Sequence, residues 1–174
     1  MFRILKKIIT TGVITEKFKL PPDNELETLG IAIKSQLERY FSGSLAIRQV
    51  DAGSCNGCEL EIHALNNPYY DIERFGVHFV ASPRHADILL VTGPVSRHMQ
   101  TALLRTYAAT PDPKWVIAVG DCAACGGEFG ESYASCGAVA NVIPVDVVIP
   151  GCPPTPIALM QGILGLMRKK LDAH

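Results

Sequence analysis

The sequence predicts an α/β domain built on a mostly parallel sheet with helices on both faces. Two observations carry this prediction: short, almost wholly apolar runs alternate with segments of helical periodicity, and glycine, proline or serine marks their ends. Strands that are buried on both faces read as continuous apolar runs, because neither face meets water. The chain has 174 residues, of which 48% are hydrophobic and 19% charged, which suits one domain with short extensions.

Each element follows from its local pattern. Five apolar runs predict strands at 45–50, 77–81, 86–92, 115–119 and 145–149. Helical spacing of apolar residues predicts helices at 25–41, from the first cysteine loop through about 66, at 97–108 and at 155–170. We therefore divide the chain into an N-terminal basic amphipathic and helical extension, residues 1–44, and an α/β domain, residues 45–174.

The N-terminal segment is basic, although the whole chain carries a formal net charge of −1. Within residues 2–9, Leu5, Ile8 and Ile9 fall on one side of a helix and the basic residues fall largely elsewhere. Such a segment can lie on a membrane surface, dock on a partner or fray as a free terminus. The near-neutral overall charge gives no general attraction to nucleic acid, and no apolar stretch reaches the roughly 20 residues that a membrane span needs.

Four cysteines follow the ends of predicted strands. Cys55 and Cys58 form a Cys-x-x-Cys turn after the first strand, and Cys122 and Cys152 follow the fourth and fifth strands. The functional crevice of such a sheet lies beyond the carboxyl ends of its strands, so these thiols can converge there. Four thiolates can bind a four-iron cluster or a zinc ion. The lack of a second close Cys-x-x-Cys or His pair disfavours zinc, and a redox dithiol would leave Cys122 and Cys152 without a role.

Two further cysteines are expected to have roles other than metal binding. Cys125 lies three residues after Cys122, and with four better-matched thiolates available we expect it to be a small packing residue near the cluster. Cys136 is expected to be buried. No secretory pattern precedes these cysteines, which favours reduced thiols.

The chain has no phosphate-binding glycine loop and no Ser–His–Asp signature, so nothing supports nucleotide binding or hydrolysis.

The ordered motifs also resemble a known family. They are VDAGSCNGCELEI at 50–62, SPRHAD at 82–87, VGDC at 119–122 and IPVDVVIPGCPPTP at 143–156. Together they resemble the small iron–sulfur subunit of membrane-bound, energy-converting [NiFe] hydrogenases of the formate hydrogenlyase type, which is homologous to the B subunit of respiratory complex I. The resemblance covers about 45–171 and implies a flavodoxin-like domain with one [4Fe-4S] cluster on Cys55, Cys58, Cys122 and Cys152. Complex I subunits place two cysteines side by side at the first site, so the Cys-x-x-Cys spacing favours the hydrogenase branch.

The resemblance implies an electron-transfer subunit with no catalytic residue of its own. Electrons would pass between the [NiFe] site of a hydrogenase-like large subunit and a ferredoxin-like iron–sulfur subunit. Membrane arm subunits would anchor this complex, with the present chain peripheral on the cytoplasmic face of the inner membrane. The alternatives are a quinone-reducing, complex I-like subunit with the same cluster and a zinc-stabilised scaffold.

Two charged residues match family positions. Either Glu59 or Glu61 could relay protons or support the cluster at the large-subunit interface, and Glu61 is the better candidate by the resemblance. Interaction with the helix dipole is the structural alternative for both. Arg84 lies in the loop before the third predicted strand. A cation near a cluster raises its reduction potential, and a surface ion pair is the alternative for this arginine.

Overall fold

The centre of the protein is a wholly parallel sheet. The structure, a computed structural model, describes residues 2–11 and 24–171. Its five strands lie in the order β2-β1-β3-β4-β5. They are β1 (Leu45–Asp51), β2 (Val77–Phe79), β3 (Ile88–Thr92), β4 (Trp115–Val119) and β5 (Val147–Ile149). This is the strand order of flavodoxin-like, doubly wound folds, and it confirms the predicted fold class.

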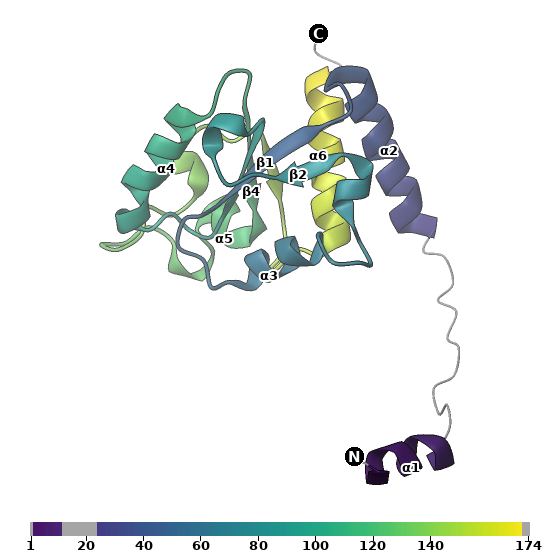
Figure 1. Cartoon of the computed structure of the whole chain (residues 1–174). Coiled ribbons are helices and arrows are strands. Elements are labelled where there is room, and N and C mark those ends of the chain that lie inside the picture. Colours follow the sequence, from purple (N-terminus) through teal and green to yellow (C-terminus); the bar gives the residue numbers. More distant parts are fainter. Residues whose placement is uncertain (1, 12–23, 172–174) are drawn as a thin grey trace.

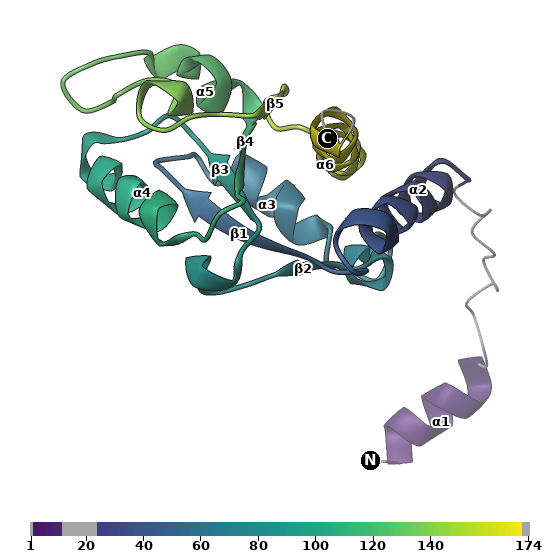
Figure 2. The ribbon, with the colours of Figure 1, turned by 90° about the horizontal axis from the view of Figure 1, so that it is seen from above.

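Helices cover both faces of the sheet (Figures 1 and 2). The α-helices are α1 (Phe2–Thr11), α2 (Asn24–Tyr40), α3 (Gly57–Ala64), α4 (Arg97–Ala109), α5 (Gly120–Cys125) and α6 (Pro156–Leu171). Single 3₁₀ turns are η1 (Ile72–Phe75), η2 (Pro83–His85), η3 (Gly127–Phe129) and η4 (Val139–Asn141). One core packs α2, α3 and α6 against the sheet, and a second core packs α4 and α5 against the other face. None of the helices in the described ranges is long and apolar enough to cross a membrane.

The central strand β3 explains why its sequence is an unbroken apolar run. All five of its residues are buried. Successive side chains of a strand point to opposite faces, so Ile88 and Leu90 enter the first core whereas Leu89 and Val91 enter the second. The strand therefore has no exposed position for a polar residue, and its last residue, Thr92, donates its hydroxyl to the Val50 carbonyl oxygen at 3.4 Å.

Two aspartates account for strands that begin later than the sequence predicts. Asp87 lies just before β3 and accepts a hydrogen bond from the Ala46 backbone N–H at 2.8 Å. Asp146 lies just before β5 and accepts one from the Val116 N–H at 2.9 Å. Each carboxylate takes a backbone N–H of the neighbouring strand, so the regular ladder starts one residue further on.

Helix α2 packs on the domain from within the segment assigned to the N-terminal extension. Leu26, Ile33 and Leu37 are buried in the first core, where α2 lies beside α6. Gly30 faces the ring of Phe75, which leaves no room there for a Cβ. Residue 45 is the start of the sheet, and the division of the chain at this point stays a prediction.

Candidate iron–sulfur site

The four predicted cysteine ligands surround one cavity at the carboxyl edge of the sheet. Cys55 lies in the loop after β1, Cys58 in the first turn of α3, Cys122 in α5 after β4, and Cys152 in the loop after β5. All four line the same cavity of about 130 Å³. Three segments far apart in the sequence therefore bring their thiols together, as the topology predicts.

The four thiols differ in their exposure. Cys58 is buried, Cys122 is half-buried, and Cys55 and Cys152 are exposed. Burial, together with negative charge on Glu59 and on the other three cysteines, raises the pKa of the Cys58 thiol to about 11. Burial and the neighbouring Cys152 and Cys55 also raise the pKa of Cys122. Four thiolates this close therefore need a cationic centre among them, which a bound metal provides.

Hydrogen bonds within the first cysteine loop fix its shape. Asp51 Oδ1 accepts bonds from the backbone N–H groups of Gly53 at 2.8 Å and Ser54 at 2.9 Å. The Ser54 Oγ accepts a bond from the Asn56 N–H at 3.2 Å. Asn56 takes a left-handed conformation, with φ of 71°, at the start of α3. The hydrogen bonds shape the chain around Cys55, and the left-handed Asn56 turns it between the two cysteines, both of which line the cavity.

Asp121 ties the second cysteine segment to the third. Its backbone N–H donates to the Gly151 carbonyl oxygen, and its Oδ1 accepts from the Gly151 N–H, each at 2.9 Å. Cys122 and Cys152 are the next residues along the two segments. This reciprocal pair of bonds therefore sets the separation of their sulfurs.

Replacing Asp121 with alanine should loosen this connection. The Gly151 N–H loses its acceptor, and one such bond contributes about 1 kcal/mol to the free energy of unfolding. We expect faster loss of bound metal to a chelator, with the fold retained. Asp112→Ala is the matched control, because Asp112 is an exposed aspartate whose contact is an ion pair with Lys114 at 3.4 Å. Equal rates of metal loss for both variants would contradict the role given to Asp121.

Glycines leave the sulfurs room against the backbone. A Cβ on Gly120 would lie 2.7 Å from the Cys58 Sγ, and one on Gly127 would lie 2.7 Å from the Cys122 Sγ. A Cβ on Gly93, after β3, would lie 2.5 Å from the Ser54 N. All three have positive φ, which favours glycine. The chain thus comes close to the cavity only because these side chains are absent.

The other candidate residues named from the sequence do not line the cysteine cavity. Glu61 is half-buried on α3, three residues beyond Cys58. Arg84 is exposed in η2, which contacts α4 and precedes the amino end of β3, so the structure does not bring Arg84 to the cysteine cavity. Cys125 is exposed, and its Sγ donates to the Asp121 carbonyl oxygen at 3.2 Å. Cys136 is buried in the second core, as expected.

The burial of Glu59 is a feature that sequence reasoning missed. This residue is 5% exposed, and neither carboxylate oxygen accepts a hydrogen bond from any described residue. The sequence interpretation considered Glu59 together with Glu61, either as a proton relay or support of the cluster or as a complement to the helix dipole, but it did not predict that Glu59 is buried. Within the described residues, no three His, Cys, Asp or Glu side chains are grouped tightly enough to bind a single metal ion.

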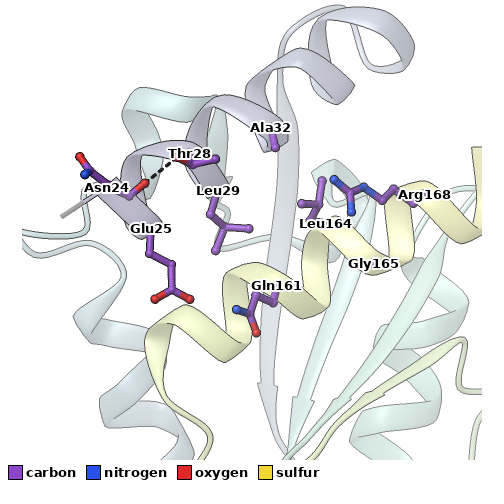
Figure 3. Close-up of a pocket in the computed structure, with 9 residues that line it drawn as sticks. All are labelled: Asn24, Glu25, Thr28, Leu29, Ala32, Gln161, Leu164, Gly165 and Arg168. Carbon is purple, nitrogen blue, oxygen red and sulfur yellow. Dashed lines mark hydrogen bonds between the residues drawn. The ribbon is translucent and has the colours of Figure 1, made fainter.

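A larger cavity lies away from the cysteines. It has a volume of about 540 Å³ and runs between α2 and α6 (Figure 3). Leu29, Ala32 and Leu164 give it an apolar lining, and Glu25 and Arg168 lie toward its two ends. No cysteine lines it. We therefore take the smaller cavity, which the four cysteines line, as the candidate functional site.

The parallel α/β domain with four cysteines at its carboxyl edge agrees with a match to a family of oxidoreductase subunits. The family model described as "NADH ubiquinone oxidoreductase, 20 Kd subunit" matches residues 55–166. The chain belongs to this family.

Two relatives are named as subunits of a hydrogenlyase and of a membrane-bound hydrogenase. Formate hydrogenlyase subunit 7 of Escherichia coli (strain K12) is 47% identical over 82% of this chain, which spans 57% of that relative's length. A probable membrane-bound hydrogenase subunit of Pyrococcus furiosus is 48% identical, and the match covers 78% of this chain and 81% of the relative.

Solved structures share the fold. A chain of an archaeal membrane-bound sulfane sulfur reductase superimposes with a TM-score of 0.66 at 35% identity, covering 86% of this chain and 78% of that one. A chain of an NAD⁺-reducing [NiFe]-hydrogenase gives a TM-score of 0.55 at 18% identity, covering 72% of this chain and 92% of that one. The second likeness concerns the fold alone.

Proposed function

We propose that this chain is an electron-transfer subunit that holds one [4Fe-4S] cluster on Cys55, Cys58, Cys122 and Cys152. The observation that carries the proposal is the meeting of these four thiols around one cavity at the carboxyl edge of the sheet. A [4Fe-4S] cluster takes one thiolate for each iron and, when bound, accepts and donates single electrons. The donor set and the glycine-lined approach fit such a group.

A multi-iron cluster fits the site better than zinc. The four thiols line a cavity of about 130 Å³, and among the described residues no three such side chains are close enough to bind a single metal ion, whereas a structural zinc ion needs four ligands at about 2.3 Å from one point. The two exposed cysteines, Cys55 and Cys152, leave one side of the site open to a partner. That is the side through which electrons would enter or leave.

Exposed apolar side chains near the site support a partner subunit there. Leu60, on the helix that holds Cys58, is 61% exposed, and Phe129 and Tyr133 are 68% and 97% exposed. Phe129 and Gly53 line one surface cavity, which places that aromatic side chain beside the first cysteine loop. We assign this surface to a hydrogenase-like large subunit that carries a [NiFe] site.

The relatives suggest the rest of the assembly. Their names place them in a formate hydrogenlyase and in a membrane-bound hydrogenase, so we propose a ferredoxin-like iron–sulfur subunit and membrane arm subunits as further partners. In this assembly the chain would be peripheral, on the cytoplasmic face of the inner membrane. A quinone-reducing complex is the second candidate, because the matching family is named after a subunit of NADH ubiquinone oxidoreductase.

Metal and sulfide analysis tests the proposal. The chain should be purified anaerobically and assayed for iron, acid-labile sulfide and zinc, with EPR spectra before and after reduction. We expect about four iron and four sulfide per chain, and an EPR signal that appears on reduction, as one [4Fe-4S] cluster requires. A chain that carries zinc and no sulfide would overturn the redox function. Nickel in the large subunit together with hydrogen-dependent activity of the complex would indicate the hydrogenase, and the absence of both would favour the quinone reductase.

Glu61→Gln tests the proposed proton relay. The substitution keeps size and helix propensity but removes the ionisable carboxyl group, and loss of a proton-transfer group slows a step by roughly 100-fold or more. We expect turnover of the complex to fall by at least about tenfold with an unchanged cluster EPR spectrum. Glu38→Gln, at an exposed position on α2, is the matched control. Unchanged turnover in the Glu61 variant would reject the relay.

A further inference from the structure

Helix α1 presents an apolar face that nothing in the described chain covers. Phe2, Ile4, Leu5 and Ile9 are 91%, 66%, 51% and 77% exposed. Large aliphatic and aromatic side chains rarely gather on one exposed helix without a function for that surface. Figures 1 and 2 both show α1 apart from the α/β body.

The helix separates its residues by chemistry. At 100° per residue, the apolar residues Phe2, Ile4, Leu5 and Ile9 fall on one side of α1. Arg3, Lys6 and Lys7 occupy the opposite side, with Lys6 and Lys7 near its two borders. At these borders the aliphatic parts of the two lysine side chains can run along the apolar side, while their ammonium groups reach outward. The ten-residue helix carries no acidic residue.

We propose that α1 lies flat on a lipid bilayer with anionic headgroups, with its apolar face among the acyl chains. Charge complementarity favours this occupant: three cations and no anion match a surface of negative phosphates. A protein groove is a poorer match within this chain, since the groove between α2 and α6 carries both Glu25 and Arg168. Arg168 would repel the basic helix.

The size of α1 defines its role. Ten residues form too short a helix to cross a bilayer, and one short apolar face gives weak, reversible binding. Attached to a complex, even a weak contact adds strongly to retention at the membrane, because the second contact becomes intramolecular. Helix α1 thus acts as an auxiliary membrane contact of this subunit. The inference does not depend on the cluster or on the identity of the large subunit.

Vesicle flotation with the full-length chain tests the inference. Two vesicle types are compared, phosphatidylcholine alone and phosphatidylcholine mixed with phosphatidylglycerol. We expect binding to the anionic vesicles to exceed binding to the neutral ones by at least about tenfold, and to fall as salt screens the headgroups. Leu5→Glu should reduce anionic binding by at least about tenfold, because it places a charge in the apolar face while keeping helix propensity.

Two further variants make the test specific. Ile31→Glu is the matched control, since Ile31 is 58% exposed on α2, and it should bind vesicles like the unaltered chain. Phe2→Trp should report a blue-shifted fluorescence on anionic vesicles, and brominated acyl chains should quench it. The inference is overturned if Leu5→Glu binds as well as the unaltered chain, or if neutral vesicles bind equally well. It is also overturned if crosslinks from α1 in the intact complex go to a protein and vesicle binding is absent.

Discussion

Replacing Cys152 with serine is expected to remove the cluster and stop electron flow through the subunit. A serine hydroxyl is a poor ligand for iron at neutral pH, whereas the cysteine thiolate supplies one of the four bonds that the cluster needs. Bound iron should fall by more than about tenfold, and hydrogen-dependent turnover of the complex should fall with it. Cys152 is exposed at the rim of the cavity, so the fold itself should be retained. Iron analysis and circular dichroism measure the two effects separately.

Cys125→Ala is the control for this prediction. Cys125 lies three residues from Cys122 but is exposed, and its Sγ donates to the Asp121 carbonyl oxygen. It does not line the cysteine cavity. We expect its removal to change bound iron little. Iron lost from the Cys125 variant and kept by the Cys152 variant would show that the ligand set is wrong.

Gly120→Ala should be almost as damaging as the loss of a ligand. The added Cβ would lie 2.7 Å from the Cys58 Sγ and 3.2 Å from the Gly151 carbonyl oxygen, and Gly120 has a φ of +83°. A left-handed alanine costs about 1–3 kcal/mol, and the displaced sulfur can no longer meet the other three at the same spacing. We expect less bound iron and a lower free energy of unfolding, measured by metal analysis and denaturant titration.

Gly165→Ala is the matched glycine control, with the opposite expected sign. Gly165 lies within α6, and no atom lies within 4 Å of the Cβ that it would gain. Alanine in a helix is favoured over glycine by about 0.5–1 kcal/mol, so this variant should be slightly more stable with full iron content. If Gly120→Ala also kept its iron and stability, the close approach of the Gly120 backbone to the Cys58 sulfur would not be needed for metal binding.

The sequence predicts the sheet and the position of the cysteines well, because both depend on local patterns. Each predicted strand is present, and β4 has the predicted bounds. Parallel strands end at one edge, so residues after β1, β4 and β5 must approach one another whatever the helices between them do. The convergence of Cys55, Cys58, Cys122 and Cys152 follows from this topology.

Other features depend on contacts between distant residues, which no local pattern reveals. The carboxylates of Asp87 and Asp146 replace the first ladder bonds of neighbouring strands, so β3 and β5 are shorter than their apolar runs. The bridge from Asp121 to Gly151 joins segments 30 residues apart. Arg84 matches a family motif, but it precedes β3 and therefore lies toward the amino edge of the sheet, opposite the cysteines.

An iron anomalous difference map from crystals grown anaerobically tests the central claim most directly. We predict iron density inside the cavity between β1, β4 and β5, within bonding distance of the sulfurs of Cys55, Cys58, Cys122 and Cys152. A single zinc peak at this position, or iron bound to Cys125 or Cys136 in place of any of the four, would contradict it.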